Sequence, residues 1–170
     1  MGAKPINIYI EGANNSGRRS LLSWLQFETF HPLVFERKKL VMEYAFTKHN
    51  KTKLLFWIGG KLLLFRTRLN EAQGIILIVD ATDPKSFEDA YKAFDDTNGS
   101  LERKLPVLVF LNKQDLLGAL PKEVIIEQIK LKKYEVEYHV EEISIKEGKG
   151  IKEGLDWLIN AIKNDKKGKK

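Results

Sequence analysis

Residues 6–20 read INIYIEGANNSGRRS. The stretch starts as a short apolar run of strand length, 6–10, and passes into a turn rich in Gly, Asn and Ser. Gly12 and Gly17 have the spacing G-x-x-x-x-G of a loop that binds phosphate through backbone N–H groups and a helix N-terminus. Leucines at helical spacing follow over residues 21–25. The stretch therefore predicts a strand, a phosphate-binding turn and a helix in direct succession.

The residues after the second glycine depart from the full motif, G-x-x-x-x-G-K-[ST]. Arg18 stands at the lysine position and supplies the same charge on a bulkier, planar group. Arg19 stands where a hydroxyl would ligate Mg²⁺, but a guanidinium offers only donors and positive charge. Ser20 either donates to an inner phosphate or begins the helix, and the loop alone is equally consistent with an ordinary strand-to-helix turn. The candidate phosphate-binding residues are Gly12, Asn14, Asn15, Ser16, Gly17, Arg18, Arg19 and Ser20.

A second polar stretch, 112–115, reads NKQD and comes directly after the apolar run 105–111. Ligands of parallel sheets bind at the carboxyl ends of the strands. Asp115 can accept two hydrogen bonds there, from the N1–H and the exocyclic amine of guanine, whereas adenine lacks this pair of donors. The stem of Lys113 can cover the base, and Asn112 can tie this loop to the glycine-rich loop. The alternative is a polar loop in which Asp115 caps a turn.

A third polar stretch, 144–146, reads SIK and follows the alternating apolar residues of a predicted strand over 136–140. At a strand end its backbone N–H groups can contact the base oxygen, although the stretch is uninformative by itself. The candidate guanine-binding residues are Asn112, Lys113, Asp115, Ser144, Ile145 and Lys146.

Apolar runs of strand length alternate with stretches of helical spacing, which predicts parallel βαβ units. The strand-like runs are 6–10, 54–58, 74–79 and 107–111, and the helical stretches are 21–25, 87–94, 124–129 and 151–162. Two further strands, about 39–47 and 51–58, flank a polar tetrad and predict an antiparallel hairpin. We expect one domain over 1–163 and a disordered, lysine-rich tail over 164–170.

The composition of the chain is that of a folded domain and excludes several kinds of functional site. The chain has 170 residues, of which 43% are hydrophobic and 31% charged, as in a folded domain, and its net charge is +6. It has no cysteine, which excludes disulfides, thiolate metal sites and cysteine nucleophiles. The apolar runs are far shorter than a membrane span, and Ile6 replaces the Ser or Thr of a myristoylation signal. Aromatic residues do not interleave with basic ones, so no specific nucleic-acid binding is expected.

Taken in order, the motifs resemble those of the small Ras-like GTPases, and most closely those of the ADP-ribosylation factor (Arf) family. The resemblance covers residues 6–163 and rests on stretches 12–20, 57–61 (WIGGK), 79–83 (VDATD), 112–115, 144–146 and 154–158 (GLDWL). It implies the three-layer α/β fold of a P-loop small GTPase, with a mostly parallel six-stranded sheet, one antiparallel strand and about five helices. It also implies bound GTP or GDP and switch segments whose shape depends on the γ-phosphate.

The departures from the family all fall on the metal and γ-phosphate side. Trp57 replaces the aspartate that orients Mg²⁺ in the family, and Lys61 replaces the glutamine that positions the attacking water. No Ser or Thr occurs over 31–44 to serve as the switch threonine, and Thr29 is too early. The expected switch-region residues are Trp57, Gly59, Gly60 and Lys61. We therefore assign no catalytic residue and no metal ligand, and we do not expect Mg²⁺.

The sequence favours an Arf-like protein that binds GTP or GDP without Mg²⁺, has little or no hydrolysis and acts through a protein partner. Arg18 and Arg19 would supply the charge otherwise carried by lysine and the metal. One alternative is a nucleotide-free pseudo-GTPase in which Trp57 and the two arginines fill the pocket, and another is an active GTPase completed by a partner. We expect a cytoplasmic monomer or heteromer whose association with a membrane, through a partner or the basic tail, is at most peripheral. Candidate partner contacts are Phe35, Arg37, Lys38 and Lys61.

Overall fold

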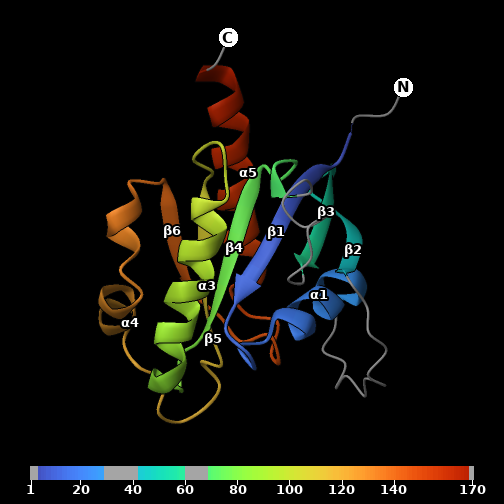
Figure 1. The fold of residues 1–170 in the computed structure, drawn as a ribbon. Coiled ribbons are helices and arrows are strands. Elements are labelled where there is room, and N and C mark those ends of the chain that lie inside the picture. The colour runs from blue at the N-terminus through green and yellow to red at the C-terminus, as the bar shows by residue number, and fades with distance from the viewer. Residues whose placement is uncertain (1–3, 29–41, 60–68, 169–170) are drawn as a thin grey trace.

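The computed structural model describes residues 4–28, 42–59 and 69–168. Its strands are β1 (Ile6–Gly12), β2 (Met42–His49), β3 (Thr52–Gly59), β4 (Gly74–Asp80), β5 (Val107–Asn112) and β6 (Tyr138–Glu142). Its α-helices are α1 (Arg18–Phe27), α3 (Phe87–Gly99), α4 (Lys122–Gln128) and α5 (Ile151–Gly168). Short 3₁₀ turns occupy Pro84–Ser86 and Leu131–Tyr134. Figure 1 shows strands and helices alternating along most of the chain.

The strands form one six-stranded sheet in the order β2-β3-β1-β4-β5-β6. β2 and β3 pair antiparallel, as the hairpin pattern predicted, and the other neighbours pair parallel. The predicted sheet, mostly parallel with one antiparallel strand, is therefore confirmed. Because β1 lies between β3 and β4, the turn after Gly12 emerges near the middle of the carboxyl edge of the sheet.

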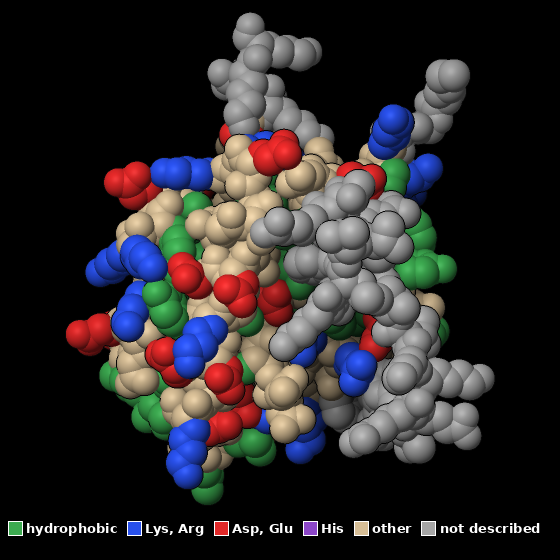
Figure 2. All heavy atoms as spheres, viewed as in Figure 1, with side chains coloured by type: hydrophobic (Ala, Val, Ile, Leu, Met, Phe, Trp, Pro, Cys, Tyr) green, Lys and Arg blue, Asp and Glu red, His purple; other side chains and the backbone are tan. Residues whose placement is uncertain are grey.

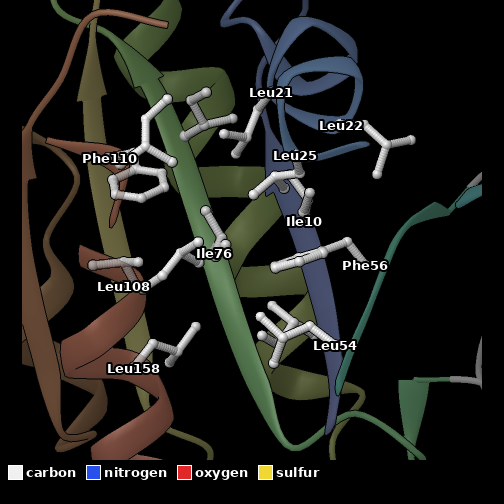
Figure 3. Close-up of a cluster of buried hydrophobic side chains, with 14 of the residues drawn as sticks. Ile10, Leu21, Leu22, Leu25, Leu54, Phe56, Ile76, Leu108, Phe110 and Leu158 are labelled. Carbon is white, nitrogen blue, oxygen red and sulfur yellow. The ribbon is translucent and has the colours of Figure 1, made fainter. Parts of the chain in front are cut away.

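Alternating side chains of the central strands supply two cores, one on each face of the sheet. Ile8 and Ile10 of β1 belong to the core on the face that α1 and α5 cover. Figure 3 shows Ile10 in this core, together with Leu158 of α5, which is fully buried. Tyr9 points to the opposite face, with the buried side chains of α3 and α4. Strands β4 and β5 are buried along their whole length, as expected for parallel strands covered on both faces. The result is a helix, sheet, helix arrangement.

The described residues contain four α-helices, in keeping with the expected fold. One feature differs from the sequence-based expectation: α5 continues to Gly168, whereas the tail was expected to be disordered from residue 164. Extending an established helix adds one hydrogen bond for each residue that is ordered, and lysine is a good helix former that suits a helix C-terminus. The packed apolar face of α5 therefore supports extra turns of polar residues.

Surface charge is mixed on the face formed by α3 and α4. Figure 2 shows basic and acidic side chains interspersed there. The ion pairs include Lys92 with Glu88, 3.5 Å apart, and Lys133 with Asp95, 3.3 Å apart. This face therefore does not have the single-sign charge of a polyanion-binding surface. None of the helices within the described residues is long and apolar enough to cross a membrane.

Candidate nucleotide-binding site

Three of the polar stretches meet at the carboxyl edge of the sheet. The register places Gly12 beside Ile78 and Asp80 beside Asn112, so the loops after β1, β4 and β5 leave the sheet together. The loop after β6 joins them, because Gln114 N donates to the Ile143 carbonyl at 3.2 Å. The tertiary structure thus unites the predicted phosphate and guanine stretches, which are about 100 residues apart in the chain.

The glycine-rich loop has a backbone that only glycine accommodates at two positions. Gly12 has φ 152°, and a Cβ there would lie 2.3 Å from the Ile78 carbonyl oxygen. Gly17 has φ 110°, and its Cβ would lie 2.5 Å from Nδ2 of Asn112. Asn15, exposed at φ 62°, is a residue type that tolerates the left-handed region. The glycine spacing therefore reflects a tight turn pressed against β4 and β5.

Helix α1 begins with backbone donors that face the loop. Gly17 caps the helix without a side-chain hydrogen bond, and the first intrahelical bond runs from Leu21 N to Gly17 O at 2.8 Å. The N–H groups of Arg18, Arg19 and Ser20 precede that bond, at the positive end of the helix dipole. Ser20 is the third residue of the helix. Backbone groups can therefore hold a phosphate at this point.

Asn14 and Ser16 occupy different environments within the loop. Asn14 is exposed, whereas Ser16 is fully buried. The Ser16 hydroxyl has no hydrogen-bond partner in the described part of the chain. A buried hydroxyl without a partner is uncommon, because its desolvation is not compensated.

The two arginines are paired with carboxylates. Nη1 of Arg18 lies 3.4 Å from Oε1 of Glu11 on β1, and Nε of Arg19 donates to Oε1 of Glu43 on β2 at 2.7 Å. Both charges were expected to face phosphate, yet each has an internal counter-ion. Sequence reasoning missed both glutamates. A carboxylate in a buried strand directly before Gly12 was the available signal for Glu11.

Glu11 is the centre of a buried network. Its side chain Oε2 accepts hydrogen bonds from the Tyr9 hydroxyl at 2.7 Å and from the Thr97 hydroxyl at 2.9 Å. Its Oε1 accepts from Gly12 N at 2.9 Å, besides its contact with Arg18. Burial first, and then the charge of Glu11, raise the pKa of the Tyr9 hydroxyl, which therefore stays protonated as a donor.

Asn112 links the loops, as predicted. Its Nδ2 donates to the Ser16 carbonyl at 2.9 Å, and its Oδ1 accepts from Ile145 N at 3.2 Å. Asn112 is 5% exposed, so both bonds are shielded from water. The N–H of Ile145, expected to contact the base oxygen, is therefore committed to Asn112.

Asp115 is oriented by the loop after β6. The Ser144 hydroxyl donates to its Oδ1 at 2.7 Å, and Nζ of Lys146 lies 3.9 Å from its Oδ2. Ser144 is itself held by a 3.1 Å hydrogen bond from Glu147 N. The Asp115 side chain is 9% exposed. This carboxylate is therefore positioned before any base binds, and the Ser144 hydroxyl has a role that the sequence did not indicate.

Lys113 is held by Asp80 at the end of β4. Lys113 has φ 72°, and its Nζ donates to Oδ2 of Asp80 at 2.5 Å. Oδ1 of Asp80 accepts from the backbone N and the hydroxyl of Thr82, at 3.0 and 2.7 Å. Burial raises the pKa of Asp80, but the hydrogen bonds from Lys113 and Thr82 outweigh it, and the pKa lies below its ordinary value. A charged Asp80 thus positions the lysine of the base loop.

Trp57 is part of the core on the α3 face. It is 4% exposed, and its ring centroid lies 4.6 Å from that of Tyr9. Gly59 ends β3. The switch-region residues Gly60 and Lys61 lie outside the described residues, as do the candidate partner contacts Phe35, Arg37 and Lys38. Thr29, which is too early to be the switch threonine, also lies outside them.

Among the described residues, the groups at this edge of the sheet suit a guanine nucleotide better than a magnesium ion. The glycine cradle, the unpartnered Ser16 hydroxyl and the positioned Asp115 suit a phosphate chain joined to a guanine base. At the two positions where the resemblance implies contacts to Mg²⁺, the chain has Arg19 and Trp57, which supply no ligand oxygen.

The sheet order, the glycine-rich loop and the NKQD stretch define an α/β protein with the fold of the P-loop GTPases. The fold matches the solved structure of the Arl6 BBS3 small GTPase from Trypanosoma brucei, which contains the nucleotide analogue GppNp. The TM-score is 0.77 at 17% identity, over 95% of this chain and 99% of that chain. The model of the ADP-ribosylation factor family matches residues 1–162, so the chain belongs to this family, whose members are GTP-binding proteins.

Curated relatives agree with this assignment. ADP-ribosylation factor 3 of Arabidopsis thaliana is 28% identical over 174 residues, which cover 96% of this chain and 91% of the relative. ADP-ribosylation factor-like protein 3 of Chlamydomonas reinhardtii is 28% identical over 168 residues, covering 92% and 90%. The resemblance inferred from the motifs is thus confirmed at the level of the family.

Proposed function

We propose that this protein binds GTP or GDP with the base read by Asp115 and the phosphates held by the backbone of the glycine-rich loop. The observation that carries the proposal is the position of Asp115, fixed by Ser144 at 2.7 Å. Asn112 supports it by joining the base loop to the Ser16 carbonyl. A pre-positioned acceptor loses little conformational entropy when the base binds, which favours recognition.

We infer that binding does not need Mg²⁺ and that hydrolysis is slow or absent. Phosphoryl transfer depends on positioning and on neutralising charge, and each such group contributes a large factor to the rate. Arg19 is occupied by Glu43, and Trp57 is buried in the core. In the family pattern, Lys61 stands where glutamine positions water, and a charged lysine cannot accept a hydrogen bond. The bound nucleotide would therefore stabilise one conformation of the protein and would not be turned over in a cycle of hydrolysis and exchange.

We further propose that this shape serves contact with a protein partner in the cytoplasm. Tyr44 and Phe46 support this, because they lie on the edge strand β2 and are 63% and 59% exposed. Their rings touch edge to face with centroids 5.8 Å apart. Exposed aromatic side chains are typical of protein interfaces. Substituting both with Ser should reduce co-purification of a partner without lowering nucleotide content.

Mass spectrometry of nucleotide released when the purified protein is denatured tests the proposal. One aliquot is first dialysed against EDTA and another against buffer with Mg²⁺. We expect GDP or GTP in equal amounts from both. Release by EDTA would contradict the metal-free mode, whereas adenine nucleotides would contradict the base assignment.

A second candidate function is that of an interaction module that binds no nucleotide. The pairing of Arg18 with Glu11 and of Arg19 with Glu43 favours it, because both loop cations already have partners. Its prediction is an empty site after gentle purification and no change in thermal stability when GDP or GTP is added. Nucleotide content and thermal stability, measured on the same purified sample, therefore distinguish the two candidate functions.

A further inference from the structure

Glu11 carries a negative charge at the base of the loop that the proposed function assigns to phosphate. The residue is 8% exposed, and four donors from Tyr9, Gly12, Arg18 and Thr97 surround its carboxylate. The Gly12 N–H and the Thr97 hydroxyl are neutral donors. The Tyr9 hydroxyl is also neutral, because burial and then the charge of Glu11 raise its pKa. Arg18 is thus the ion-pair partner of Glu11 in the described part of the chain.

Arg18 occupies the place in the motif at which a lysine would contact the outer phosphates. Its side chain is 25% exposed and that of Glu11 is 10% exposed, so the pair is largely shielded from solvent. If Arg18 turned toward a phosphate, the carboxylate of Glu11 would stay buried without a cation. Leaving a buried charge uncompensated is strongly unfavourable. The pair therefore resists exchange for a phosphate contact.

We propose that Glu11 is a specificity-determining residue that retains Arg18 and withholds it from the phosphates of a bound nucleotide. This inference rests on the proposed function. Glu11 also accepts the N–H of Gly12, which takes one backbone donor away from the ligand side of the loop. The affinity for the nucleotide then comes from the guanine base and the remaining backbone donors. The phosphates add less to this affinity than they would if Arg18 were free to contact them.

The test compares the affinities of guanosine and GDP by titration calorimetry in EDTA. Glu11→Gln keeps the shape and an acceptor oxygen but removes the charge, which frees Arg18. We expect GDP to bind about 10-fold to 100-fold more tightly, the range of one charge-assisted hydrogen bond, with guanosine unchanged. Adding Arg18→Gln to Glu11→Gln should abolish the gain. Glu123→Gln makes the same change of net charge at an exposed position of α4 and should leave both affinities unchanged.

The outcomes separate this inference from the proposed function. If neither ligand binds to the wild type or to Glu11→Gln, the proposed function fails, and the inference fails with it. If both bind and Glu11→Gln leaves their ratio unchanged, the inference is overturned while the proposed function stands.

The wild-type protein provides a second test in case Glu11→Gln does not fold. The Arg18 side-chain N–H signal in a ¹⁵N NMR spectrum, assigned from its loss in Arg18→Lys, reports the partner of this guanidinium. We expect the signal to stay in place when GDP saturates the protein, because Arg18 stays with Glu11. A large shift with GDP that guanosine does not produce would overturn the inference.

Discussion

Asp115 illustrates how one residue can define a ligand class. Its carboxylate is 9% exposed and oriented by Ser144, so it presents acceptors and no donor. Guanine offers two hydrogen-bond donors on one edge, and these pair with the two carboxylate oxygens. Changing either the base or the carboxylate removes this pairing. A single substitution should therefore change which base is bound.

We predict that Asp115→Asn weakens GDP binding and creates binding of xanthosine diphosphate. Nδ2 of the asparagine is a donor and cannot accept from the guanine amine, whereas xanthine has a carbonyl there that accepts from Nδ2. Losing one charge-assisted hydrogen bond costs about 2 kcal/mol, or roughly 30-fold in affinity. Calorimetry with both nucleotides checks this. Unchanged GDP affinity would show that Asp115 does not contact the base.

Asp80 gives a prediction about pH. Its folded-state pKa lies below the ordinary value of 3.8, because the hydrogen bonds from Lys113 and Thr82 outweigh burial. The unfolded chain therefore takes up a proton at a higher pH than the folded one. The stability that Asp80 contributes is complete above about pH 4 and is lost as the pH falls through the lower, folded-state value.

Accordingly, we predict that Asp80→Asn is less stable than the wild type by about 1.5–3 kcal/mol at pH 7, the range for hydrogen bonds to a charged group. The difference should shrink as the pH falls from 4 toward 3. Urea unfolding at a series of pH values measures this difference, and substitution of the exposed Asp89 of α3, Asp89→Asn, controls for net charge. A difference that is constant with pH would argue against a charged Asp80 in the folded protein.

At the scale of the element, the turn between β1 and α1 depends on backbone geometry more than on side chains. We predict that Gly12→Ala destabilises the protein by at least ~1–3 kcal/mol, because a Cβ at φ 152° would meet the Ile78 carbonyl at 2.3 Å. Gly99→Ala is the matched control, since no atom lies within 4 Å of its Cβ at the end of α3. In urea unfolding, Gly12→Ala should have a lower free energy of unfolding than the wild type. Gly99→Ala should have an equal or higher one, because alanine suits a helix better than glycine. Equal stabilities for Gly12→Ala and the wild type would contradict the geometry of the loop.

At the scale of the whole molecule, a ligand that joins loops from four strands should stabilise the entire fold. We predict that GDP at 100 times its dissociation constant adds about 2.7 kcal/mol to the free energy of unfolding. For a chain of this size that corresponds to a rise of roughly 5–10 °C in Tm. Differential scanning calorimetry should show the shift with GDP and not with ADP, and equally in EDTA. An equal shift with ADP would refute recognition through the guanine donors.

Much of the fold could be predicted from local patterns. The apolar runs indicated β1, β4 and β5, and the polar tetrad indicated the turn between β2 and β3. Both signals are local, because the burial of a strand and the type of a turn depend on residues that are neighbours in the chain. The sequence did not indicate that α5 reaches Gly168, because lysine is a good helix former and is also common in disordered tails. Periodicity alone does not distinguish these two states.

The sequence by itself determined the order of the elements, the glycine-rich turn and the presence of a carboxylate, Asp115, that can read guanine. Each follows from residues close together in the chain. Only the tertiary structure decided which charges meet. It placed Glu11 against Arg18 and Glu43 against Arg19, and it brought Ser144 to Asp115. Such pairs depend on how strands and helices pack across the sheet, because the energy of an ion pair is set by distance and burial, and neither is written in the spacing of the residues.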